Sequence, residues 1–360
     1  MRKILTRVGL CIFSLIFAVL IFEGMLRLFT PKPQNLAKLQ SSNLFLYENK
    51  PGASFVHASG EDGYRNKIVF NSSGFRDTDF SLDKNADTVR IAVIGDSYEE
   101  ALQLPLEDTW QKVMQSQLSS TKQVEVYNFG VSGYGTDQEW LTLREKVWKF
   151  KPDIVILAFT ANDLGDVYKN NLVYLKDGRL TVRGAGERAG GNVLGKFARQ
   201  TYFYHFLTNV SALNPYSKQV FSKLRTKVLG FATDDRFFLS DAQLIQGPFE
   251  VIASQKNPPP AVLSTWEVVK ALIADMQKQA NEHSAKFVVT TNINKSRISE
   301  VEWKNLQEQY KLNVGESSSS EIINVLNGYL NSAGITFFDP YQQGWTLQPQ
   351  RCTFHGDCSC

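Results

Sequence analysis

The chain has 360 residues, with 39 basic and 36 acidic side chains and a formal net charge of +3. This length allows one large domain or two, and a hydrophobic content of 43% suffices for a packed core. Because the charges nearly balance, the chain lacks the basic field that nucleic-acid binding needs, and we expect no nucleic-acid partner.

The N-terminus has the pattern of a membrane anchor. Three basic residues precede an almost entirely apolar run, residues 8–22, and Glu23 follows it. Fifteen residues are short for a full span, but apolar residues continue to Pro31. A cleaved signal peptide is the alternative, although no small-x-small site follows the run. We predict an uncleaved single-pass anchor over residues 1–30, with the rest of the chain periplasmic or extracellular because the positive charges stay inside.

Residues 31–68 are polar and aromatic and are interrupted by proline and glycine, which predicts an extended linker. We assign residues 69–360 to one globular domain. Within it, the alternation of strands and helices breaks at about residues 165–262, which we interpret as an insertion.

Three hydrophobic strands organise the domain, and each ends in small or polar residues. Residues 89–94 lead into Gly95-Asp96-Ser97, residues 124–128 lead to Gly130, and residues 154–159 lead to Asn162. Helical patterns separate these strands, and two further strands follow at 286–291 and 335–339. Strand and helix in alternation predict an α/β fold, a three-layer α/β/α sandwich around a mostly parallel sheet. Because the carboxyl ends of parallel strands share one edge, we expect Ser97, Gly130 and Asn162 to converge there.

These three segments resemble the SGNH (GDSL-type) hydrolase family, and the resemblance covers roughly residues 70 to 165. It implies that Ser97 is the nucleophile, and that Gly130 and Asn162 supply donors to an oxyanion hole. Residues 71–76, Asn-Ser-Ser-Gly-Phe-Arg, resemble a segment that precedes the first catalytic strand in membrane-anchored members. A turn at Ser73-Gly74 is the ordinary explanation of that segment.

A serine nucleophile needs a base, and the chain has four histidines. Three of them are poor candidates, because His57 lies in the predicted linker, His205 in the insertion, and His283 at a helix end. His355 follows the last predicted strand, where the chain returns to the catalytic edge, so it is the best base candidate by elimination.

The family pattern of an aspartate two or three residues before the histidine is not met at His355, where Cys352 stands in place of the aspartate. Alternatively, Asp357 is the aspartate of the motif and its histidine is missing. That alternative implies a truncated or inactive protein, and the absence of a final helix after the last strand points the same way.

The cysteines and the insertion each leave two interpretations open. Cys352, Cys358 and Cys360 crowd the C-terminus, where two of them could pair in an oxidising compartment. A zinc site with His355 would lack a second ligand pair, so we expect neither a metal nor a cofactor. Residues 196–230 are basic and aromatic, which fits a cap near the membrane or the active site, or a helical insertion with a solvated face.

We therefore predict a membrane-anchored serine ester hydrolase that removes acyl groups, most plausibly O-acetyl, from a cell-surface carbohydrate. An O-acyltransferase on the same fold is one alternative. A carbohydrate-binding or assembly protein that has lost its base is the other. A flavodoxin-like nucleotide binder fits the sheet, but the chain has no glycine-rich phosphate loop.

Overall fold

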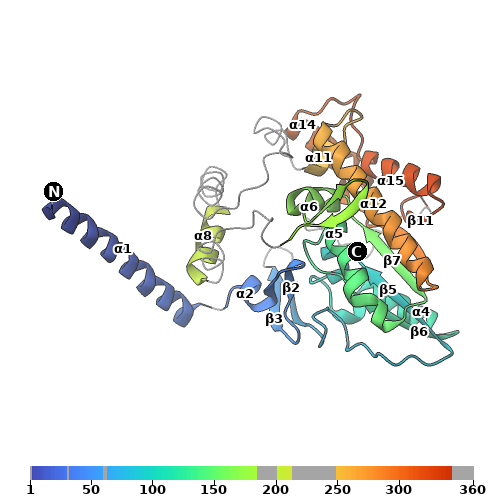
Figure 1. Ribbon diagram of the computed structural model, residues 1–360, viewed down its shortest axis with the longest axis horizontal. Helices are drawn as coiled ribbons and strands as arrows, with labels where there is room; N and C mark the ends of the chain where they lie inside the picture. Colours follow the sequence, from blue (N-terminus) through green and yellow to red (C-terminus); the bar gives the residue numbers. More distant parts are fainter. Residues whose placement is uncertain (1, 31, 60–62, 185–200, 213–248, 343–360) are drawn as a thin grey trace. The chain divides into compact units, whose positions relative to one another are not determined.

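The computed structural model describes residues 2–30, 32–59, 63–184, 201–212 and 249–342 (Figure 1). His355, Asp357 and the three C-terminal cysteines lie outside these residues. The chain divides into two compact units, which we describe separately.

The larger unit is built on a five-stranded sheet in the order β11-β10-β7-β5-β6. Its strands are β5 (Thr88–Ile94), β6 (Gln123–Asn128), β7 (Ile154–Phe159), β10 (Lys286–Thr291) and β11 (Thr336–Phe338). Every neighbouring pair is parallel, with Val93 opposite Asn128 and Ile94 opposite Leu157. The predicted parallel α/β sheet is therefore confirmed.

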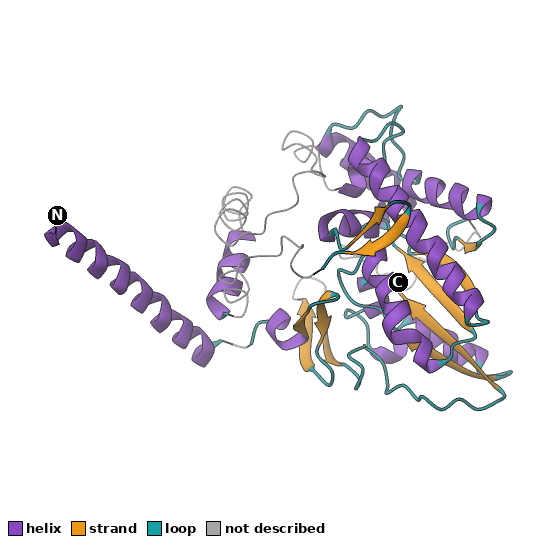
Figure 2. Cartoon of the chain, viewed as in Figure 1, coloured by secondary structure: helices purple, strands orange, loops and turns teal. Residues whose placement is uncertain are grey.

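Helices cover the two faces of the sheet, because successive strand residues point to opposite sides (Figure 2). Ile91 and Val93 of β5 pack on the face that carries α4 (Trp110–Leu118), through Met114. Ala92 and Ile94 belong to the larger core on the other face. Side chains of α5 (Thr136–Thr142), α12 (Pro260–Glu282) and α15 (Glu321–Ser332) complete that core.

The remaining elements of this unit are short. Beyond α5 the chain forms a π-helical turn, Leu143–Val147, and a 3-10 turn, Trp148–Phe150. The others are a 3-10 turn at Leu106–Asp108, α3 (Ser97–Glu100), α6 (Asp163–Asn170), β8 (Val173–Lys176), β9 (Arg179–Val182), α11 (Phe249–Ala253), α13 (Lys295–Ile298) and α14 (Glu300–Tyr310). The hairpin β8–β9, within the expected insertion, was not predicted.

The expectation of an extended linker over residues 31–68 is wrong for most of that range. After α2 (Gln34–Lys38), strands β1 (Leu39–Ser42) and β2 (Leu46–Asn49) pair, as do β3 (Ser54–Ser59) and β4 (Tyr64–Val69). Phe45 is buried in the main core and Ile68 in a smaller one. In β3 and β4, covered and exposed positions alternate, which is the pattern of strands that bury one face.

The smaller unit contains α1 (Arg2–Phe29) and α8 (Tyr202–Ala212). The part of α1 from Thr6 to Phe29 is long and apolar enough to cross a membrane. A helix of this kind at an N-terminus is also typical of a signal sequence.

Candidate active site

The strand order reverses at one point along the carboxyl edge of the sheet. The chain passes from β5 to its neighbour β6 on one side and then to β7 on the other side of β5. Ligands of open α/β sheets bind where the strand order reverses in this way. Helix α3 begins with Ser97 directly after β5, and α6 follows Asn162 directly after β7.

Ser97 is presented by a tightly capped helix. Asp96 is the N-cap of α3, and its Oδ1 accepts the Tyr98 N–H at 2.9 Å. Glu99 Oε2 accepts the Asp96 N–H at 3.1 Å, which completes a capping box. Asp96 therefore fixes the turn that presents Ser97. The half-buried Ser97 hydroxyl makes a long contact of 3.5 Å with Asp96 Oδ2.

The structure brings Asn162 to the same carboxylate oxygen as Ser97. Asn162 Nδ2 donates to Asp96 Oδ2 at 2.9 Å and makes a longer contact of 3.4 Å with Asp166 Oδ2. Since the Ser97 hydroxyl also contacts Asp96 Oδ2, the hydroxyl and the amide are neighbours. This is the juxtaposition of strand ends that the sequence predicts.

Gly130 lies against α3, but its N–H already has a partner. It donates to Asn128 Oδ1 at 2.9 Å, and Asn128 Nδ2 in turn donates to the Glu99 carbonyl at 2.6 Å. A Cβ at position 130 would lie 2.4 Å from Glu99 Cβ, so only glycine allows this approach. Gly130 could therefore serve an oxyanion only if the Asn128 side chain moved away.

The described histidines have other surroundings. His283 ends α12 before the amino end of β10, at the opposite edge of the sheet from Ser97, and stacks on Trp148 at 4.2 Å. His57 Nε2 lies 3.1 Å from the Tyr64 hydroxyl within the β3–β4 hairpin. His205 belongs to α8 in the smaller unit. Within the larger unit, His283 and His57 therefore have surroundings away from Ser97, and the predicted base, His355, lies outside the described residues.

Several buried carboxyl groups lie near Asp96. Burial raises the pKa of Glu99 to about 8, with a further contribution from Asp96. Burial also raises the pKa of Glu139 and Asp163 well above their usual values, and nearby carboxylates add to both shifts. Among the residues that the structure describes, both carboxyl oxygens of Glu139 and Oδ1 of Asp163 have no hydrogen-bond partner. These groups therefore favour the neutral acid.

Asp163 also holds the turn before α6, because its Oδ2 accepts the Thr160 N–H at 2.8 Å. In the part of the chain that the structure describes, no three His, Cys, Asp or Glu side chains are arranged to bind a metal ion.

Sequence reasoning missed the support that Arg76 gives to the serine helix. Its buried guanidinium donates to the Glu100 carbonyl at 2.9 Å and also to the carbonyls of Ala101 and Leu104. Ala101 ends α3 in the left-handed region, at φ 45°. Arg76 thus satisfies carbonyls at the end of the helix that begins with Ser97. The Asn-x-x-Gly-Phe-Arg segment was the available signal, but sequence alone did not give its role.

The same segment also holds the end of β6. Asp77 Oδ2 accepts the Asn128 N–H at 3.0 Å, and Lys112 forms an ion pair with the Asp77 carboxylate. Asn71 Oδ1 accepts the N–H groups of Ser73 and Phe75, which folds the turn at Gly74. One segment therefore fixes both α3 and the strand end that precedes Gly130.

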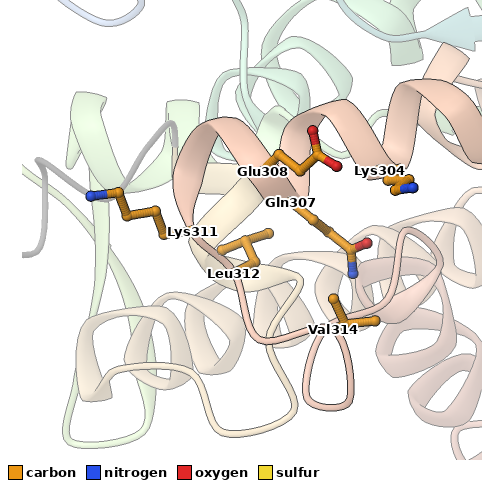
Figure 3. A pocket seen from close by; sticks show the side chains of 6 residues that line it. All are labelled: Lys304, Gln307, Glu308, Lys311, Leu312 and Val314. Atoms are coloured by element: carbon orange, nitrogen blue, oxygen red, sulfur yellow. The ribbon is translucent and has the colours of Figure 1, made fainter.

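A surface pocket lies elsewhere, along α14 and the loop that follows it (Figure 3). It is lined by Lys304, Gln307, Glu308, Lys311, Leu312 and Val314. None of these residues comes from the carboxyl ends of β5, β6 or β7. We therefore place the candidate site at the strand ends and not in this pocket.

Comparison with known proteins gives a family match. A model of the GDSL-like lipase/acylhydrolase family matches residues 93–300, more than half of the chain. The matched segment includes Ser97, Gly130 and Asn162. No protein of curated function matches the chain in sequence.

Similar solved structures include TesA, with 12% identity, a TM-score of 0.35, and coverage of 73% of this chain and 86% of that chain. A catalytic mutant of Axe2, an acetylxylan esterase from Geobacillus stearothermophilus, has 11% identity, a TM-score of 0.34, and coverage of 76% and 86%. A GDSL-like lipase from Bacteroides thetaiotaomicron has 12% identity, a TM-score of 0.32, and coverage of 76% and 81%. Similarity at this level carries no information about substrate.

Proposed function

Because the chain belongs to the GDSL-like lipase/acylhydrolase family, we propose that it is a serine ester hydrolase with Ser97 as the nucleophile. The observation that carries this proposal is the shared contact of the Ser97 hydroxyl and the Asn162 amide with Asp96 Oδ2. It supports a nucleophile and an oxyanion donor within reach of one acyl group.

In this mechanism the Ser97 Oγ attacks the acyl carbonyl carbon while a base takes the hydroxyl proton. We assign the base to His355, with Asp357 as a candidate partner. The carbonyl oxygen becomes an oxyanion, and two groups donate to it. One is the Ser97 N–H, and the other is the Asn162 Nδ2–H that exchanges its longer 3.4 Å contact with Asp166 Oδ2 for the oxyanion. Ser97 is the first residue of α3, where backbone N–H groups have no partner within the helix.

Collapse of this intermediate breaks the ester bond and forms an acyl-serine. The alcohol leaves with the proton that the base held. Water then attacks the acyl-serine and gives a proton to the base, the bond to Ser97 Oγ breaks, and that proton returns to the serine. The products are a carboxylic acid and the free enzyme, so the reaction needs no cofactor.

We further propose that α1 anchors the protein in the cell membrane with the hydrolase domain periplasmic or extracellular. The basic residues before the apolar run favour this orientation. A domain in that location meets acylated carbohydrate, and O-acetyl groups are the substrate that we favour. The support for this substrate class is location, and not any contact of the site.

Labelling of the full-length protein with a fluorophosphonate probe tests the nucleophile. We expect covalent labelling of the protein, its loss in Ser97→Ala, and its retention in Ser120→Ala, which changes an exposed serine after α4. Labelling that persists in Ser97→Ala would contradict the proposal. Loss of labelling in His355→Ala with an unchanged melting temperature would support the base assignment.

One observation favours a second candidate, a carbohydrate-binding protein without catalysis. The Gly130 N–H is held by Asn128, so one donor of a three-donor oxyanion hole is occupied. This candidate predicts no labelling of the folded protein and binding of acylated oligosaccharide that Ser97→Ala leaves unchanged. An O-acyltransferase would instead label normally and pass its acyl group to an added sugar faster than to water.

A further inference from the structure

Helix α8 begins at a carboxylate that α1 supplies. Glu23 Oε1 accepts the Tyr202 N–H at 3.1 Å, and Glu23 Oε2 accepts the Phe203 N–H at 2.7 Å. Thr201 Oγ1 accepts the next N–H along the helix, that of Tyr204, at 3.1 Å. The first N–H groups of a helix have no partner within the helix and favour negative charge. Glu23 therefore caps α8 from a segment about 180 residues earlier in the sequence.

Aromatic and charged contacts surround this cap. The Phe22 ring meets the rings of Phe203 and Phe206 edge to face, at 5.9 and 5.3 Å. Arg27 donates to Glu23 Oε1 at 2.6 Å, and its guanidinium lies 5.1 Å from the centre of the Tyr202 ring. The carboxylate is thus neutralised and hydrogen-bonded at once, as an acidic side chain near lipid must be.

The covered positions of α1 form one stripe. Val19, Phe22, Glu23 and Leu26 are half-buried or buried, at the spacing of a single helix face, and Gly24 beside them is half-buried too. By contrast, Phe17 is 55% exposed. The contacts with α8 therefore concentrate at the C-terminal end of α1, while the rest of the helix keeps the exposed apolar surface of a lipid-facing span.

Glu23 lies near one boundary of the membrane if α1 crosses it. At 1.5 Å per residue, Glu23 is about 26 Å along the helix axis from Thr6. The hydrocarbon core of a bilayer is about 30 Å thick. The start of α8 then falls close to the outer edge of that core, where tyrosine and other aromatic side chains are favoured.

Helix α8 has the side chains for such a position. Its first five residues are Tyr-Phe-Tyr-His-Phe, and Phe206 and Val210, one turn apart, are 39% and 45% exposed. We propose that α8 is an interfacial helix: it docks on α1 through Glu23, and its Phe206 and Val210 face the outer leaflet lipids. This proposal rests on the proposed membrane anchor. It gives the chain a second contact with the bilayer, so the segment around α8 is held at the membrane surface.

Photo-crosslinking in lipid nanodiscs tests this placement in the full-length protein. The photoreactive amino acid p-benzoylphenylalanine replaces Val210, Phe17 of α1, or Leu118 of α4, and crosslinked phospholipid is detected by mass spectrometry. Leu118 is a matched control, because it is an apolar helix residue of similar exposure, 41%, in the hydrolase unit. We expect lipid adducts at positions 17 and 210 and none at position 118.

The outcomes separate the two proposals. Adducts at position 17 without adducts at position 210 would overturn the interfacial helix and leave the anchor intact. Crosslinks from position 210 to the protein chain in place of lipid would overturn it as well. The absence of adducts at position 17 would remove the anchor and, with it, this inference.

A second variant tests the role of Glu23. Glu23→Ala removes both acceptors of the cap, and we expect lipid adducts at position 210 to fall about fivefold, on the scale of a lost helix cap. Adducts at position 17 should not change. Glu300→Ala, in the first turn of α14, is the control and should leave both positions unaffected. An unchanged yield at position 210 in Glu23→Ala would show that Glu23 does not dock α8.

Discussion

Two groups of buried ionisable side chains lie along the carboxyl edge of the same sheet. Beyond β11, Asp339 is paired with Arg297 at 2.9 Å, and both side chains are almost fully buried. Beyond β5, β6 and β7, respectively, Glu99, Glu139 and Asp163 are also fully buried, but they lie close to each other. The first group neutralises its charge by pairing, whereas the second favours the bound proton.

This difference indicates which strand ends along the carboxyl edge form the active site. A buried ion pair needs only its partner, and it fixes the position of one strand end. A cluster of buried acids with raised pKa values is costly to maintain, and such clusters concentrate at functional sites. The cluster lies beneath the strand ends that carry Ser97 and Asn162, which agrees with the site proposed here.

Breaking the ion pair should have the largest effect on stability. In Arg297→Met, the Asp339 carboxylate loses its cation and stays buried, so we expect the free energy of unfolding to fall by about 3–5 kcal/mol. Chemical denaturation measures this loss. The paired change Arg297→Met with Asp339→Leu should recover most of it, because no buried charge remains. A loss below about 1 kcal/mol in the single variant would contradict this account.

Asn162→Ala should affect catalysis more than stability. The loss of one oxyanion donor costs about 3 kcal/mol of transition-state stabilisation, so we expect kcat/KM for an aryl acetate to fall roughly a hundredfold. The melting temperature should change little, because the Asn162 side chain is only half-buried. An activity within twofold of the unchanged protein would exclude Asn162 from the oxyanion hole.

Arg76→Lys tests whether the Asn-x-x-Gly-Phe-Arg segment positions Ser97. Lysine keeps the charge, but its ammonium cannot match the planar fork that reaches three carbonyls. We expect the rate of fluorophosphonate labelling to fall about tenfold, an effect of about 1.4 kcal/mol. Lys112→Arg, on the neighbouring ion pair with Asp77, is the conservative control. Equal labelling rates in both variants would mean that Arg76 does not position the serine.

The sequence predicted the sheet and the meeting of Ser97 with Asn162 because each strand is a continuous apolar run with a polar end. It did not predict the strands before residue 70, since short half-buried strands resemble polar loops in composition. It also could not show that Asn128 holds the Gly130 N–H, because that bond depends on how Asn128 is fixed by the Glu99 carbonyl. The role of Arg76 in holding α3 was not predicted for a similar reason, because its acceptors are backbone carbonyls that any residue could supply.

The smallest effect should come from Glu99→Gln, which removes one member of the acid cluster and keeps an acceptor for the Asp96 N–H. The pKa of Glu99 rises from 4.5 to about 8 on folding, so the folded protein binds more protons than the unfolded chain between these values. Stability due to this group is therefore fully present below about pH 4.5 and is lost as the pH rises towards 8.

Because glutamine does not titrate, we expect the variant to lose less stability between pH 5 and pH 8, by at least about 1 kcal/mol. At pH 5 itself the substitution should cost under about 1 kcal/mol, since it replaces a neutral acid with a neutral amide. Denaturant titrations at pH 5, 6.5 and 8 measure the difference, with Glu300→Gln of α14 as the exposed control. If the free energy of unfolding of the variant has the same pH dependence as that of the unchanged protein, Glu99 is ionised over this whole range. The contrast with the Arg297–Asp339 pair would then not depend on a proton bound to Glu99.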